Sequence, residues 1–220
     1  MMRMLPHSWI LGAVAAMGAA SPVLADCVPP KPVKITAVNS SPRQTTDSFS
    51  GKPKVIYRMG KGKARLEEQL DPEKNVHMLI VVDMPKAWYI EQVSKTAQFV
   101  TDDDPKSRLT LPVISDNKLP PELLALEYGC EEEFIADPKT MHEKTQTSTG
   151  VAVKHSITSG PWKLTLATRE STGKPVAAVL TREGKVETAI QYLSYEVLES
   201  PPKDLFVLPK GIKVLPREKR

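Results

Sequence analysis

The sequence has few residues of the kinds that most active sites and membrane spans require. Among its 220 residues there are only 2 cysteines and 4 histidines, and aromatic residues make up 5%. No segment beyond the first 25 residues reaches the ~18 consecutive apolar residues of a membrane-spanning helix. The low aromatic content and the 20 prolines exclude a transmembrane protein, a coiled coil and collagen, and 40% hydrophobic residues exclude a fully disordered chain.

Residues 1–25 have the composition of a secretory signal peptide. Arg3 provides the positive charge, an apolar run begins at Trp9, and Val23 and Ala25 are the small residues that a signal peptidase recognises. We therefore expect cleavage after residue 25 and a periplasmic location. The formal net charge of +4, which falls to +3 without Arg3, is too small to predict a nucleic-acid partner.

Cys27 and Cys130 are the only cysteines, and both remain after the predicted cleavage. An even number of cysteines in an exported chain predicts one disulfide bond between them. The alternative is that Cys27 carries a lipid, since residues 24–27 resemble a lipoprotein attachment sequence. Asp26 stands where that sequence has a small residue, so we favour the disulfide.

The pattern of apolar residues predicts one β domain over residues 51–215, preceded by a proline-rich arm at 26–50 and followed by a basic tail at 216–220. Within the arm, only Val33–Val38 is expected as a strand, at a sheet edge. The expected strands of the domain follow one another with short turns, which indicates antiparallel pairing. They cover residues 54–59, 63–70, 77–82, 87–93, 97–100, 151–157, 162–168, 175–182 and 185–199.

One helix interrupts this series of strands. Pro120 and Pro121 are tolerated in a first helical turn, a short apolar stripe follows from Leu123, and Gly129 is a typical end. Glu131-Glu132-Glu133 either extend this helix or follow it. The fold class expected is therefore mainly β: a single curved antiparallel sheet, a half-open barrel, with one short helix as lid or plug.

No catalytic or metal-binding arrangement can be recognised. His142 and Glu143 begin like a zinc-protease motif, but the second histidine is missing. The acidic run at 102–104 lacks the glycine and the glutamate of a calcium loop. We expect no metal, no cofactor and no enzymatic activity.

A curved sheet with one helix leaves part of its concave face uncovered, and such a surface binds apolar ligands or a partner. Some of the large apolar side chains of the strands and of residues 204–212, which we call the closing segment, are expected to line this cleft. The alternative for each is a place in the core. The candidates are Trp88, Trp162, Leu164, Tyr192 and Phe206.

The order of several short motifs resembles the superfamily of bacterial lipoprotein-localisation factors and related periplasmic proteins of unassigned function. The resemblance covers about residues 51–215 and is densest after 160. The motifs are Arg65-Leu66-Glu67, Val82-Asp83, Lys86-Ala87-Trp88, Trp162, Thr172-Gly173-Lys174-Pro175-Val176, Tyr192-Leu193-Ser194-Tyr195-Glu196-Val197 and Asp204-Leu205-Phe206-Val207-Leu208-Pro209-Lys210-Gly211-Ile212.

This resemblance implies a half-open barrel with a helical lid, whose interior receives acyl chains in the carrier members. The chain departs from the carriers in two places. Residues 26–50 are too rich in proline for the amphipathic helix with which carriers begin, and Ile212 replaces their closing tyrosine. No ligand-binding residue of the family can be transferred by position.

Two functions follow as expectations. The first is a non-catalytic periplasmic binding protein for a lipid, lipoprotein or other apolar ligand held in the concave face. The second is an interaction or scaffold module of the envelope, with a filled cavity and a protein partner. The corresponding partner is a lipid or an acylated protein, with peripheral contact to the envelope, and no nucleic-acid partner is expected. The sequence does not predict an oligomeric state.

Overall fold

A computed structural model describes residues 28–29, 31–42, 44, 51–101, 119–124, 126–148 and 150–216. The predicted signal peptide, Cys27 and the acidic run at 102–104 lie outside the described residues. None of the helices in the described ranges is long and apolar enough to cross a membrane.

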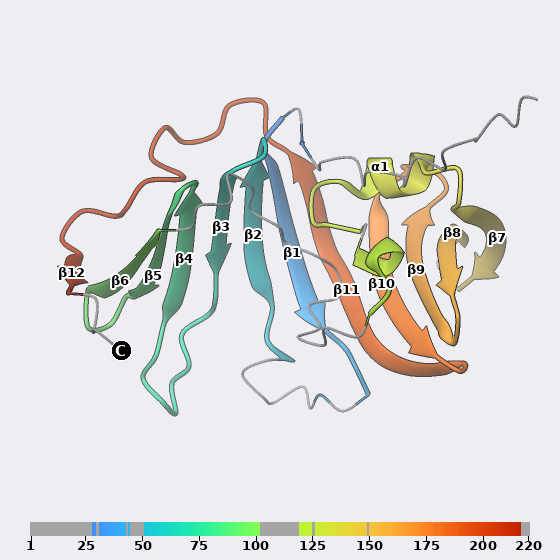
Figure 1. Cartoon of the computed structure of the whole chain (residues 1–220), viewed down its shortest axis with the longest axis horizontal. Coiled ribbons are helices and arrows are strands. Elements are labelled where there is room, and N and C mark those ends of the chain that lie inside the picture. Colours follow the sequence, from blue (N-terminus) through green and yellow to red (C-terminus); the bar gives the residue numbers. More distant parts are fainter. Residues whose placement is uncertain are drawn as a thin grey trace, which may run out of the picture.

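The described residues form one curved, unclosed sheet of twelve strands in the order β12-β6-β5-β4-β3-β2-β1-β11-β10-β9-β8-β7 (Figure 1). The predicted fold class is confirmed. The strands are β1 (Val33–Asn39), β2 (Lys54–Met59), β3 (Lys63–Glu67), β4 (Met78–Asp83), β5 (Lys86–Glu91), β6 (Thr96–Thr101), β7 (Met141–Thr147), β8 (Gly150–Ser159), β9 (Trp162–Arg169), β10 (Pro175–Arg182), β11 (Lys185–Val197) and β12 (Lys213–Leu215).

Two antiparallel meanders make up most of the sheet: β2 to β6 and β7 to β11. Their side chains alternate as the sequence predicts. In β9, for example, Leu164 and Leu166 are buried and Lys163 is exposed, the period of two of a strand with one covered face.

β1 joins the two meanders, because it pairs with β2 on one side and with β11 on the other. The expectation of an edge strand at 33–38 is therefore wrong. Val33, Ile35 and Ala37 are buried on one face of β1, and that burial compensates for the nearby prolines that suggested an irregular arm.

The helical elements differ from the single helix expected from Pro120, because the α-helix begins only at the glutamate run that was expected to extend or follow it. Pro121–Leu124 forms one short 3-10 turn, η2, and the α-helix, α1, is Glu131–Ala136. Gly129 has a φ of 87°, which ends the first segment before α1 begins. Both elements lie against the same face of the sheet (Figure 1), which we call the inner face; the opposite face is the outer face.

Two strands were not expected. β7 has no alternation of burial, because six of its seven residues are exposed at the sheet edge. β12 lies at the other edge and runs parallel to β6, with Lys213 beside Thr96.

Candidate functional site

The sheet buries opposite faces in its two halves. Over β8–β11, β1 and β2, which we call the covered half, the main core lies on the inner face. Over β4–β6, the open half, the core consists of Leu79, Val81, Ile90 and Ala97, which point to the outer face. The strand register establishes this, since Ile35, Ile56, Leu66 and Ile80 are successive partners across β1 to β4 and Leu79 alternates with Ile80.

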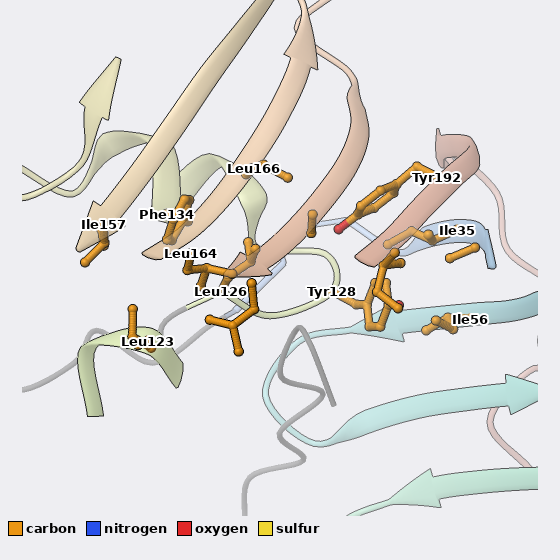
Figure 2. Close-up of a cluster of buried hydrophobic side chains, with 14 of the residues drawn as sticks. Ile35, Ile56, Leu123, Leu126, Tyr128, Phe134, Ile157, Leu164, Leu166 and Tyr192 are labelled. Atoms are coloured by element: carbon orange, nitrogen blue, oxygen red, sulfur yellow. The ribbon is translucent and has the colours of Figure 1, made fainter. Parts of the chain in front are cut away.

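Residues 119–136 fill the inner face of the covered half, and we call this segment the plug. Leu123, Leu126, Tyr128 and Phe134 are each at most 7% exposed. They pack against strand residues such as Leu164 (Figure 2). Ser159 at the end of β8 donates a hydrogen bond to Glu122 of η2, 2.7 Å long, which fixes the outer end of the plug.

A buried carboxyl group holds the other end of the plug. Glu131 is only 1% exposed, although it is the first residue of a helix. The Tyr192 hydroxyl donates to its Oε1 at 2.8 Å and the Gly129 N–H donates to its Oε2 at 3.0 Å. Tyr195 adds a further side-chain hydrogen bond to this carboxyl group.

Burial of the Glu131 carboxyl group away from water raises its pKa to about 7. The hydrogen bonds act in the opposite direction but are weaker than the desolvation. Burial and the neighbouring Glu131 also raise the pKa values of Tyr128, Tyr192 and Tyr195, so all three remain neutral donors at physiological pH.

A second buried charge supports the same segment. Arg58 of β2 is 2% exposed, and its Nη1 donates to Glu127 Oε2 at 2.6 Å and to the Tyr128 carbonyl at 3.3 Å. Next to it, Gly129 passes so close to β1 that an added Cβ would lie 2.8 Å from Val33 Cγ2. The plug is therefore attached to the sheet by charge-assisted hydrogen bonds as well as by apolar packing.

The open half presents a different inner surface. Its inner-face side chains belong to neither core cluster and are only half-buried or exposed. Most of those in the middle of the strands are apolar or aromatic, whereas Gln98 lies beside Tyr89, and Glu91 and Thr96 lie at one end. Tyr89 is 44% exposed. We call this surface the inner strip, and it consists of Ile80, Val82, Ala87, Tyr89 and Val100.

The five residues predicted to line a cleft do not share one surface. Trp162, Leu164 and Tyr192 lie on the inner face of the covered half, with or against the plug. Trp88 points to the outer face, where it packs on the second core and lies 5.8 Å from the Phe99 ring. Phe206 is 7% exposed in the closing segment. Contact of any of them with a ligand stays a prediction.

Sequence reasoning missed Arg58, Glu131 and the inner strip. Arg58 carries a detectable signal, since it continues the alternation of the buried Ile56 on β2. Glu131 had no such signal, because a run of three glutamates at a helix start is typical of an exposed first turn.

The predicted disulfide is not tested. Cys130 is 1% exposed at the start of α1, and Cys27 lies outside the described residues. The bond therefore stays a prediction, as does the alternative of a lipid on Cys27.

A hollow of about 400 Å³ opens at the ends of β2–β5, away from the plug. It is lined by Pro53, Val55, Glu67, Glu68, Gln69, Leu70, His77 and Gln92. None of the predicted cleft residues lines it, and its walls mix charged and apolar side chains.

The chain is similar to several solved structures, at low sequence identity. No protein-family model and no curated protein match the chain. Among solved structures, it is similar to an uncharacterized conserved protein from Thermus thermophilus, with a TM-score of 0.48 and 13% identity over 84% of this chain and 90% of that chain. It is also similar to MucB in complex with MucA(peri), with a TM-score of 0.34 and 10% identity over 84% of this chain and 57% of that one. A third is PNGF-II, with a TM-score of 0.35 and 9% identity over 84% of this chain and 31% of that one.

Proposed function

We propose that the protein is a non-catalytic, periplasmic binding protein of the bacterial envelope that holds an apolar ligand on the inner strip. The ligand class that fits is an acyl chain, from a lipid or a lipoprotein. The observation that carries this proposal is the arrangement of Ile80, Val82 and Tyr89, which keep apolar side chains on a curved inner face while the core of their strands lies on the opposite face.

The energetics support this ligand class. Burial of an acyl chain contributes about 0.8 kcal/mol per methylene, so about ten methylenes supply roughly 8 kcal/mol, the free energy of micromolar binding before ordering costs. Among the five strip residues Tyr89 has the only polar side chain, and its cross-strand neighbour Gln98 carries a neutral amide, so the middle of the strip holds no carboxylate or imidazole to act on a ligand. Binding without chemistry is therefore the role that these residues favour.

The test is displacement of a fluorescent apolar probe. The full chain is titrated with N-phenylnaphthylamine, and palmitate is then added. We expect bound-probe fluorescence that palmitate removes, and a loss of about tenfold or more in probe affinity for Tyr89→Asp, because a charge would enter the apolar contact.

Leu193→Asp is the matched control, because Leu193 is 51% exposed but lies on β11, outside the inner strip. Its probe affinity should equal that of the wild type. Equal affinities in both variants, or a folded protein that binds no probe, would refute the proposal.

The second candidate is an envelope interaction module with a protein partner. It is favoured by the plug, which fills the inner face of the covered half with the chain's own residues. Cross-linking in intact cells distinguishes the two functions: a single defined protein adduct, together with absence of probe binding, would support the module.

A further inference from the structure

Two histidines meet at the edge of the sheet that is formed by β7 and β8. His142 of β7 and His155 of β8 are direct cross-strand partners. Their Nδ1 atoms are 2.8 Å apart and their ring centroids 5.0 Å apart, in an edge-to-face arrangement. His142 is exposed and His155 is 6% exposed, so one ring is reached from solvent and the other is fixed by the sheet.

The far side of the buried ring has its own partner. His155 Nε2 lies 2.9 Å from the Thr168 hydroxyl oxygen on β9. When that Nε2–H donates to Thr168, Nδ1 of His155 keeps its lone pair and accepts from the Nδ1–H of His142. Moving this one proton to the solvent-facing nitrogen of His142 leaves two Nδ1 lone pairs that face each other, and rotation of the rings is needed to turn both toward one ion. A hydrogen-bonded outer nitrogen is the usual support of a metal-binding histidine.

The spacing discriminates between metals. With metal–nitrogen bonds of about 2.0 Å, two ligands at a right angle are about 2.8 Å apart, and two tetrahedral ligands are about 3.3 Å apart. The distance between His142 and His155 matches the right angle, which square-planar or tetragonal copper(II) and nickel(II) adopt. Zinc would require the rings to move apart.

From this geometry, we propose that His142 and His155 form a two-histidine site for copper(II) or nickel(II) on the edge of the sheet. Lys144, which lies on the same face of β7 as His142, forms an ion pair with Glu170 of the neighbouring turn, so its charge is compensated. Within the described residues, no group of three or more His, Cys, Asp or Glu side chains is arranged to hold a metal. Water or a small ligand would therefore complete the coordination, and the site would exchange metal readily.

The test uses the full chain purified without a polyhistidine tag. Copper(II) is titrated and followed by electron paramagnetic resonance, which reports the number of coordinating imidazole nitrogens. We expect a one-to-one complex with two such nitrogens in the wild type. In His142→Gln we expect one nitrogen and an affinity lower by about tenfold or more, because this exposed residue is replaced without disturbing the core.

Two further variants make the result specific. Thr168→Val removes the partner of the outer nitrogen and should weaken copper binding by about tenfold, the lower end of such effects. His77→Gln, on a histidine far from β7, should leave the affinity and the spectrum unchanged. A wild-type spectrum in His142→Gln, or loss of binding in His77→Gln, would overturn the proposed site, as would a wild-type chain that binds no copper at about 100 μM, well above the range of specific binding.

Discussion

The covered half and the open half of the sheet use the same secondary structure but place their cores on opposite faces. In the covered half, the plug packs on the inner face, and Glu131 and Arg58 attach it to the strands. In the open half, the closing segment packs Leu208 and Ile212 on the outer face. Either face of a strand in a meander can therefore become its core. The face that is buried is the one against which the plug or the closing segment packs.

The largest effect is expected from the core beneath the plug. Leu164→Ala should reduce the free energy of unfolding by about 3 to 5 kcal/mol, because Leu164 is fully buried and the plug holds its cavity open. The exposed Leu193 on β11 provides the control, since Leu193→Ala should change stability by no more than about 0.5 kcal/mol. Urea unfolding of both variants measures the difference, and similar midpoints would contradict a core on this face.

The second prediction compares adjacent residues of β5 that point to opposite faces. Trp88→Ala should cost about 3 kcal/mol, because it removes a ring that packs on the outer core and beside Phe99. Tyr89→Ala, one residue along on the inner strip, should change the free energy of unfolding by about 0.5 kcal/mol or less. Thermal melts that show the reverse order would place the core of the open half on its inner face.

The third prediction concerns pH. Because the pKa of Glu131 is about 7 in the folded chain and 4.5 ordinarily, the folded state binds more protons than the unfolded state between these values. The contribution of Glu131 to the free energy of unfolding should therefore be highest below pH 4.5 and fall by about 3 kcal/mol as the pH rises from 4.5 to above 7.

Glu131→Gln should abolish this decline, because an amide does not titrate. Glu132→Gln, on the exposed neighbour in the same helix, should retain it. Urea midpoints at pH 5 and pH 8 measure both, and a wild-type slope in Glu131→Gln would show that another group is responsible.

The smallest expected effect is the difference in stability between alanine variants of two glycines with positive φ. Gly184→Ala costs about 1 kcal/mol for its conformation alone, since nothing lies within 4 Å of the added Cβ. Gly129→Ala should cost about 1 kcal/mol more, because its Cβ would press on Val33 and separate the plug from β1. Chemical denaturation of the two variants should give this order, and equal losses would show that the approach of the plug to β1 is unimportant.

Short-range patterns were sufficient to predict most strands and the fold class. In β9 and in the β2–β6 meander, alternating apolar residues and short turns specify both the strand and its neighbour. The same alternation cannot say which face becomes the core. Trp88 and Tyr89 are both large aromatic residues, and only the distant closing segment selects Trp88.

The rest depends on contacts that local patterns do not contain. β7 is exposed on both faces, so its residues show no period of two. β1 is stabilised by β11, whose paired residues lie far along the chain, as Val33 and Val197 show. Glu131 is buried only because Tyr192 and Gly129 provide donors for its carboxyl group.

The central position of β1 has a consequence for how the molecule is assembled. Each meander is built from strands that are neighbours in sequence. β1, which joins them, is synthesised before both meanders, and its second edge can pair only after Tyr195 and Val197 of β11 have been synthesised. Such pairing over most of the chain length raises contact order and slows the last step of folding. Until β11 emerges, the newly made chain carries an unsatisfied strand edge, so we expect its early stages to need protection from self-association.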